Sequence, residues 1–111
     1  MELKRGDIVL CVAPGDYGKP RPAVIVQSDI FNPTHVSIVI CPITSTLQDA
    51  PLFRLDVEPG NETGLVRPSQ IMVDKITALK QERIRARLGK IDEHLRVRLD
   101  RALALFLGFA R

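Results

Sequence analysis

Short apolar runs rich in β-branched residues dominate this chain, and a single helical pattern accompanies them at its C-terminal end. Each run is bounded by Pro, Gly or a polar loop, which is typical of β-strands separated by turns. The segments that predict strands are residues 7–13, 23–26, 36–41, 53–57, 64–73 (interrupted by a proline) and 84–88. This order predicts a mainly β fold, a small and strongly bent antiparallel sheet or partly open barrel.

The last pattern predicts one amphipathic helix that covers an opening of this sheet. Asp92 is a favourable N-cap, and Gly108 is a C-terminal stop signal. The apolar positions that recur at helical spacing are Leu95, Leu99, Ala102, Leu103 and Phe106. The apolar run over residues 102–107 is longer than one helix face needs, so either a second subunit or the monomer's own core covers the remainder.

Length and charge limit the size of the fold and the kinds of partner that the chain can bind. At 111 residues the chain has the size of one domain, which we expect to span residues 1–111. The net charge of +3 is uneven, because residues 1–60 hold five Lys and Arg against seven Asp and Glu, whereas residues 61–111 hold eleven against six. The basic second part indicates either a polyanionic partner such as a nucleic acid or a solubilising surface.

Several classes of protein do not fit the sequence. The longest apolar runs, residues 8–13 and 102–107, are short of the roughly 20 residues that cross a bilayer. Residues 1–6 lack the apolar segment of a secretory signal, so we expect a cytoplasmic protein with no membrane partner. Cys11 and Cys41 lie in apolar runs without metal-ligand spacing, which predicts two reduced core thiols.

Common catalytic motifs are also missing from the sequence. It contains no Gly-rich phosphate loop, no nucleophile elbow and no zinc-binding helix motif. His35 and His94 are the only histidines, and their positions are typical of solvated residues. We therefore expect neither a metal nor a cofactor.

Three polar clusters at strand ends are the remaining candidates for chemistry. Arg21 stands between two prolines that restrain its backbone, which suits contact with a phosphate; a surface ion pair is the alternative. Thr44 and Ser45 follow a strand, where their hydroxyls either donate to a phosphate or cap a turn. The segment that runs from Arg67 to Gln70 is either a third polar cluster or a solvated edge strand.

In order along the chain, these pieces resemble the MazF/PemK/Kid family of toxins from bacterial toxin–antitoxin systems. The resemblance covers nearly the whole chain. The segments that carry it are residues 5–9 (RGDIV), 21–29 (RPAVIVQSD), 31–32 (FN), 39–45 (VICPITS), 64–65 (GL), 69–71 (SQI), 74–76 (DKI), 87–92 (RLGKID), 99–103 (LDRAL) and 107–108 (LG).

The resemblance implies a fold, an activity and partners. The fold would be an SH3-like barrel of about six short antiparallel strands with a C-terminal helix, assembled as a homodimer. The activity would be sequence-specific, metal-independent cleavage of single-stranded RNA, in which the ribose 2′-OH attacks the phosphorus and leaves a 2′,3′-cyclic phosphate and a 5′-OH. The partner would be a cognate antitoxin (MazE/PemI-like) that binds through its C-terminal segment.

The resemblance also implies catalytic residues. Arg21 matches the family's catalytic arginine, whose fixed charge would stabilise the phosphorane. Thr44 matches the second catalytic position, and its neighbour Ser45 is a helper. Arg67 matches an arginine of the PemK/Kid branch, but Ser69 stands where that branch carries an Asp assigned as the general base.

Two questions stay open at this point. Asp16 is a candidate general base, because Ser69 lacks a carboxylate. The candidate RNA-binding residues are Tyr17, Lys19, Gln70, Phe53, Arg85 and Arg87, although Phe53 also fits a core position and the two arginines also fit a solvated strand. The alternative functions are a gyrase poison like CcdB or a binding module without chemistry on the same fold.

Overall fold

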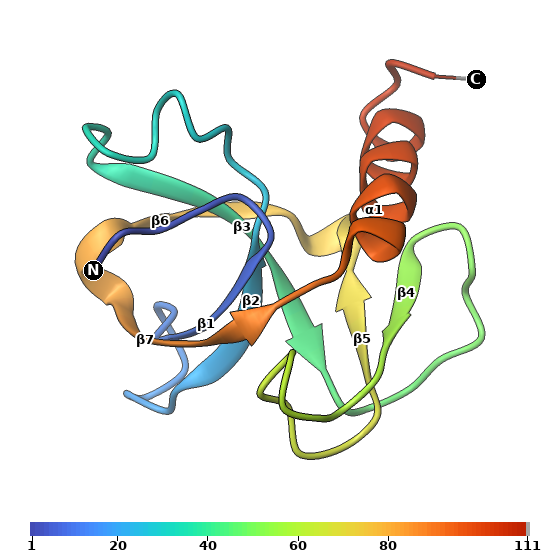
Figure 1. The fold of residues 1–111 in the computed structure, drawn as a ribbon, viewed down its shortest axis with the longest axis horizontal. Coiled ribbons are helices and arrows are strands. Elements are labelled where there is room, and N and C mark those ends of the chain that lie inside the picture. Colours follow the sequence, from blue (N-terminus) through green and yellow to red (C-terminus); the bar gives the residue numbers. More distant parts are fainter. Residues whose placement is uncertain (111) are drawn as a thin grey trace.

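The computed structural model describes residues 1–110, which contain seven strands, one α-helix and two short 3₁₀ turns (Figure 1). The strands are β1 (Asp7–Cys11), β2 (Arg21–Ile25), β3 (Ser37–Thr44), β4 (Arg54–Val57), β5 (Ser69–Met72), β6 (Thr77–Lys80) and β7 (Ile84–Lys90). The turns are η1 (Val73–Lys75) and η2 (Gln81–Arg83), and the helix is α1 (Glu93–Phe106). The expectation of a mainly β fold with a C-terminal helix is confirmed.

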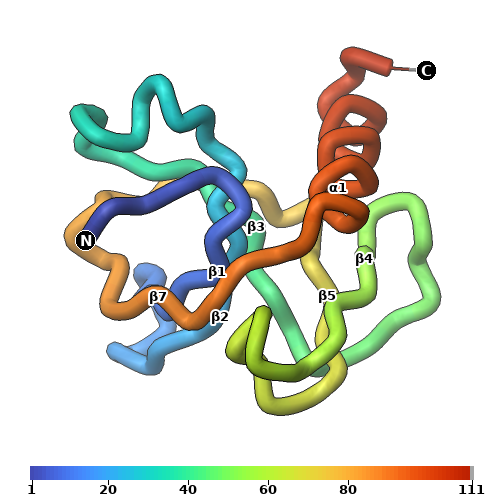
Figure 2. The backbone as a smooth tube through the Cα atoms, viewed as in Figure 1, coloured from blue at the N-terminus to red at the C-terminus, as the bar shows by residue number. Residues whose placement is uncertain are grey.

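Strand β3 organises the sheet, in which every pair is antiparallel. Its residue Ile40 pairs with Ile25 of β2 and with Thr77 of β6, so the two partners lie on opposite edges of β3. Beyond η1 the same edge continues as β5, which pairs in turn with β4. On the other side the order is β2, β1 and β7, and the backbone traces of β1 and β7 lie side by side in Figure 2. The sheet therefore curls into a small, partly open barrel.

Two hydrophobic cores lie on the two faces of this curled sheet. One lies inside the curl and includes Val9, Ile25 and Ile38. The other lies between the opposite face and helix α1, and includes Ile8 and Val24. Adjacent residues of β1 and β2 are therefore buried on opposite faces, which explains why these strands are continuously apolar in the sequence.

Helix α1 begins and ends as the sequence predicts. The Leu95 amide donates to Oδ1 of Asp92 at 2.8 Å, which is an N-cap, and Gly108 takes a positive φ of 88° just beyond the last turn. The buried residues of α1 are Leu95, Leu99, Ala102 and Leu103. Phe106 was expected on the same face, but it is half exposed because the helix runs past the edge of β4 and β5 there (Figure 1).

Three differences from the predicted strands exceed the shifts of one or two residues found at the other strand ends. Strand β6 was not predicted, because only Leu79 of its four residues is buried and no apolar alternation marks it. Strand β3 does not stop at Pro42, since Pro42 takes its place in the ladder opposite Ala23 and the strand continues to Thr44. Of the predicted extended segment 64–73, only Ser69–Met72 forms a strand.

Both thiols lie in the core, as predicted. Cys11 and Cys41 are buried and free. Burial raises the pKa of the Cys41 thiol to about 12 and also raises the pKa of Cys11, so both are protonated at neutral pH. In the part of the chain that the structure describes, no helix has the length and apolar character needed to cross a bilayer.

Candidate active site

A groove at one end of strands β2 and β3 brings together the polar clusters that the sequence indicated. Strands β2 and β3 are antiparallel neighbours. The first residue of β2, Arg21, and the last residue of β3, Thr44, therefore lie side by side at the same end of the two strands. The groove has a volume of about 330 Å³. Its lining residues are Arg21, Pro22, Pro42, Ile43, Thr44, Ser45, Thr46, Leu65, Val66, Arg67, Ser69 and Met72.

An ion pair holds the side chain of Arg21. Its Nε lies 3.3 Å from Oδ2 of Asp16, and the Arg21 side chain is 54% exposed while that of Asp16 is 26% exposed. The bond uses Nε, which leaves the outer nitrogens of the guanidinium available to an anion. Arg21 can therefore form the surface ion pair and still contact a phosphate, because the bond to Asp16 orients its guanidinium.

The loop before Arg21 has a strained backbone at Tyr17, whose φ is +53°. Tyr17 lies between two residues that anchor the turn: Asp16 donates its amide to the Ala13 carbonyl at 3.2 Å, and Lys19 donates its amide to the Asp16 carbonyl at 2.9 Å. The Tyr17 side chain is fully exposed. The loop thus carries an unburied aromatic ring next to the Asp16–Arg21 pair.

The Thr44 hydroxyl keeps its proton available. Its Oγ1 accepts a hydrogen bond from the Thr46 amide at 3.1 Å, which is the turn cap expected as an alternative. A hydroxyl that accepts one bond can still donate another, so capping and phosphate binding coexist at this residue. Ser45, which follows, is exposed in the groove.

The opposite wall of the groove carries Arg67 and Ser69. Ser69 is buried, and its hydroxyl donates to the Arg67 carbonyl at 2.9 Å. That bond uses the serine proton to shape the turn at Pro68. The Arg67 side chain is exposed and makes no hydrogen bond or ion pair within residues 1–110.

Two of the candidate RNA-binding residues, Gln70 and Phe53, do not line the groove. Gln70 is only 6% exposed, and its side-chain amide is fully used by four hydrogen bonds inside the protein. Phe53 is half-buried against the core under α1. The core position that alternation indicated for Phe53 is the one observed, whereas no sequence signal marks the bonds of Gln70.

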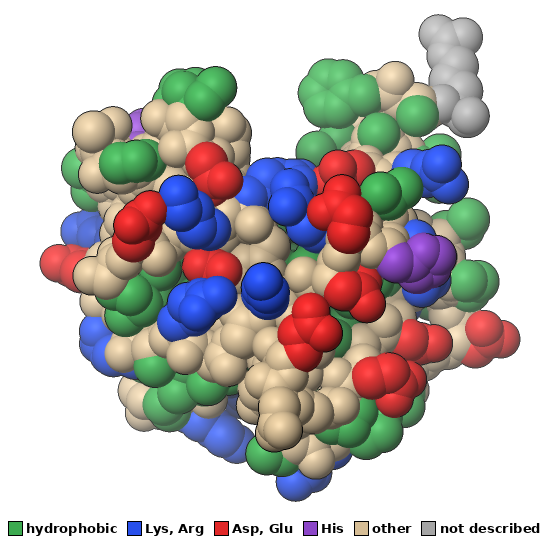
Figure 3. All heavy atoms as spheres, in the orientation of Figure 1, with side chains coloured by type: hydrophobic (Ala, Val, Ile, Leu, Met, Phe, Trp, Pro, Cys, Tyr) green, Lys and Arg blue, Asp and Glu red, His purple; other side chains and the backbone are tan. Residues whose placement is uncertain are grey.

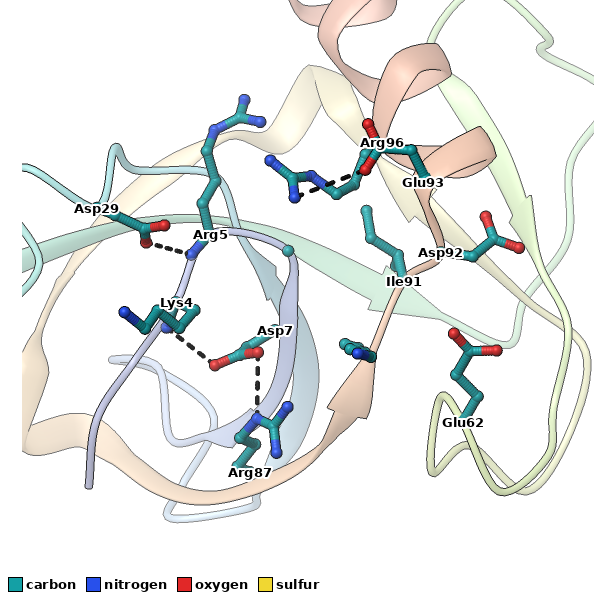
Figure 4. Close-up of a pocket in the computed structure, with 12 residues that line it drawn as sticks. Lys4, Arg5, Asp7, Asp29, Glu62, Arg87, Ile91, Asp92, Glu93 and Arg96 are labelled. Atoms are coloured by element: carbon teal, nitrogen blue, oxygen red, sulfur yellow. Dashed lines mark hydrogen bonds and ion pairs between the residues drawn. The ribbon is translucent and has the colours of Figure 1, made fainter.

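The basic strand β7 faces a second cavity. Arg87 lines it, and its Nε lies 3.1 Å from Oδ1 of the buried Asp7 (Figure 4). Lys and Arg side chains gather in the middle of this face with Asp and Glu around them (Figure 3), and the cavity of about 510 Å³ is larger than the groove of Arg21. Arg85 is exposed and donates from Nη1 to the Glu82 carbonyl at 2.6 Å. Neither arginine lines the groove of Arg21 and Thr44.

The remaining titratable groups show no second catalytic arrangement in the described residues. His35 and His94 are both exposed, one in the loop before β3 and the other on α1. Within residues 1–110, no three side chains of His, Cys, Asp or Glu come together as a metal site. Among the described residues, the groove of Arg21 and Thr44 is therefore the candidate active site.

Comparison with known families assigns the chain to a class. Residues 4–107 match the model of the PemK-like, MazF-like toxins of type II toxin–antitoxin systems, and the chain belongs to this family. The resemblance read from the sequence is confirmed.

Individual relatives sharpen this assignment. The chain is 44% identical over 109 residues to the probable endoribonuclease MazF of Mycolicibacterium smegmatis, covering 97% of this chain and 99% of that protein. It is 26% identical to endoribonuclease EndoA of Bacillus subtilis, covering 97% of each chain. Its fold is similar to that of a mycobacterial endoribonuclease solved in complex with its cognate antitoxin, with a TM-score of 0.82, 21% identity and 98% of each chain covered.

Proposed function

We propose that this chain, as one toxin domain over residues 1–111, is a sequence-specific endoribonuclease that cuts single-stranded RNA without a metal and thereby inhibits translation and growth. The observation that carries the proposal is the meeting of Arg21 and Thr44 in one groove at adjacent ends of β2 and β3. Family membership and the endoribonuclease names of the relatives support the same reaction class.

The groove chemistry fits attack by a ribose 2′-OH on the adjacent phosphorus. The 2′-oxygen forms a bond to phosphorus while the bond to the 5′-oxygen breaks; the 2′-hydroxyl loses its proton and the 5′-oxygen gains one. Arg21 stabilises the extra negative charge of the phosphorane with its outer guanidinium nitrogens, and the Thr44 hydroxyl donates to a phosphate oxygen. Ser45 and Arg67 add a hydroxyl and a charge from the groove walls.

The role of Asp16 follows from its contact. Its carboxylate lies on Nε of Arg21 and is absent from the groove lining, so we assign it to orienting Arg21 rather than to removing the 2′-proton. Ser69 holds the turn at Pro68 through its own hydroxyl. Catalysis in this proposal rests on charge and orientation.

RNA binding extends from the groove to the loop before β2. Tyr17 offers an exposed ring on which a base can stack, and Lys19 is an exposed cation in the same loop. Arg87 lines a separate cavity and Arg85 lines neither that cavity nor the groove, so any contact that these arginines make with RNA involves phosphates outside the groove.

The proposed partners are a second copy of the chain and an antitoxin, in the cytoplasm where the RNA is. The end of α1 leaves apolar side chains for which a homodimer is one cover, because Phe106 and Leu107 are each 48% exposed and Phe109 is 84% exposed. An antitoxin segment that occupied the groove would block Arg21. A solved mycobacterial relative is described in complex with its cognate antitoxin, which supports this pairing.

The test uses purified protein and a mixed-sequence RNA in the presence of a chelator. We expect discrete cuts with 5′-OH ends that disappear in Arg21→Ala and Thr44→Ala. The matched control is Arg98→Ala, which removes an exposed arginine on α1 and should cut as the wild type does. Intact RNA with folded wild-type protein would overturn the proposal and favour a gyrase poison or a binding module.

A further inference from the structure

A buried amide beside the groove has no place in the chemistry above. Gln70 lies on β5 directly opposite Thr44 of β3 in the antiparallel register. Its side chain is almost completely buried, although glutamine is mostly exposed in proteins. Burying an amide is costly unless its donors and acceptor are all satisfied, so its partners indicate what the residue does.

The Gln70 side chain binds the backbone of the loop that follows Thr44. Its Oε1 accepts from the Gln48 amide at 3.0 Å, and its Nε2 donates to the Gln48 carbonyl at 3.0 Å. One side-chain amide therefore pairs with both backbone groups of one residue, as a neighbouring strand would. Nε2 also donates to Oδ1 of Asp56 at 3.0 Å, which fixes the orientation of the amide.

Arg54 adds a second hold on the same loop. Its Nη1 donates to the Thr46 carbonyl at 3.1 Å and to Oε1 of Gln70 at 3.3 Å. The Thr46 amide is bound to Oγ1 of Thr44. Residues 46 and 48 are thus held by side chains of β3, β4 and β5, while Leu47 between them is 53% exposed.

We propose that Gln70 is a positioning residue for substrate selection: it clamps residues 46–48 beside Thr44, so that this loop presents a fixed surface to the RNA bases next to the cut phosphate. The inference rests on the proposed RNA cleavage. It assigns Gln70 no contact with RNA. The loop makes that contact, since Thr46 lines the groove directly after Thr44 and Ser45.

The clamp predicts a particular kinetic signature. Two neutral hydrogen bonds together change an equilibrium constant by about tenfold or more. In Gln70→Ala the ratio of clamped to released loop should therefore fall about tenfold, and KM for RNA should rise by at most the same factor. The kcat at the preferred site should stay within about threefold of the wild-type value, because Arg21 and Thr44 are untouched.

The matched control removes a buried side-chain amide that braces a different loop. Asn32 is 3% exposed, donates from Nδ2 to the Gln27 carbonyl at 3.1 Å, and accepts from Nε2 of Gln27 at 3.0 Å. It lies in the loop before β3, at the end of β3 far from Thr44 (Figure 1). Asn32→Ala should lower the melting temperature as Gln70→Ala does, and should leave KM and the cut sequence unchanged.

The experiment has two arms on the full chain. Hydrogen exchange of the Gln48 amide should be slow in the wild type and in Asn32→Ala, and at least tenfold faster in Gln70→Ala, whether or not RNA is cut. Cleavage of a randomised RNA pool should show a broader base preference beside the cut and a raised KM in Gln70→Ala alone.

The possible results test the clamp, its role in substrate selection and the proposed RNA cleavage separately. Unchanged exchange of the Gln48 amide in a folded Gln70→Ala variant would overturn the clamp. Faster exchange together with an unchanged KM and cut sequence would overturn its role in selection. An inactive wild type would overturn the proposed RNA cleavage, and with it the role in selection, while the exchange arm would still decide on the clamp.

Discussion

The ion pair between Asp16 and Arg21 yields a prediction that separates orientation from proton transfer. Asp16→Asn keeps the size of the side chain and one oxygen acceptor, but it removes the charge that lies 3.3 Å from Nε of Arg21. The turn should survive, because it is held by the backbone amide and carbonyl of Asp16. The change therefore acts almost entirely on the guanidinium.

The structure sets the size of the effect. More than half of the Arg21 side chain is exposed, so water screens the pair, and exposed ion pairs are worth about 0.2–1 kcal/mol. At about 1.36 kcal/mol per factor of ten, the loss of orientation should lower kcat/KM by no more than about fivefold. A general base would contribute typically 10²–10⁴-fold instead.

The assay is single-turnover cleavage of one RNA oligonucleotide by the wild type, Asp16→Asn, Arg21→Ala and the double variant. If Asp16 acts only through Arg21, the Asp16→Asn change should have no further effect once Arg21 is gone. A loss of a hundredfold or more that persists in the Arg21→Ala background would refute this reasoning and identify Asp16 as the base.

Three further predictions concern the fold. In Gly64→Ala the new Cβ would collide with the Leu88 carbonyl oxygen at a positive φ, so thermal unfolding should show a loss of more than about 2 kcal/mol; a loss below about 0.5 kcal/mol would contradict the close packing. Because burial raises the pKa of Cys41 to about 12, the unfolded state releases the proton first as pH rises above about 9. Urea titrations should then show the free energy of unfolding falling by about 1.4 kcal/mol per pH unit toward pH 12 relative to Cys41→Ala, and parallel curves would contradict it. Asp92→Ala removes the N-cap bond to the Leu95 amide and should cost about 0.5–2 kcal/mol in the same assay, whereas an unchanged midpoint would show that this cap adds nothing.

Local signals in the sequence were sufficient for most of the fold. The runs that became β1, β2 and β3 are apolar at successive positions because both faces of these strands are buried, and Asp92 and Gly108 mark the ends of α1 by their capping chemistry. Strand β6 could not be predicted, because its residues are mostly exposed. What makes it a strand is its pairing with β3, a contact between segments far apart in the sequence.

The part of the site that local sequence features mark was also predictable. The prolines around Arg21 and the hydroxyls after β3 are local features, and strand ends are places where sites are built. The bonds of Gln70 to the loop at Gln48 and the bond of Arg87 to Asp7 join residues far apart in the chain. Such contacts depend on the register of the sheet, which no short motif encodes.

In the proposed reaction the fixed charge of Arg21 stabilises the transition state of RNA cleavage. The most direct test is the single-turnover cleavage rate of wild type and Arg21→Ala in the presence of a chelator, with melting temperatures measured alongside. Removal of one such stabilising group typically costs 10²–10³ in rate, and we expect a loss of about this size with little change in stability, because Arg21 is half exposed. Equal rates for the two folded proteins would contradict the account.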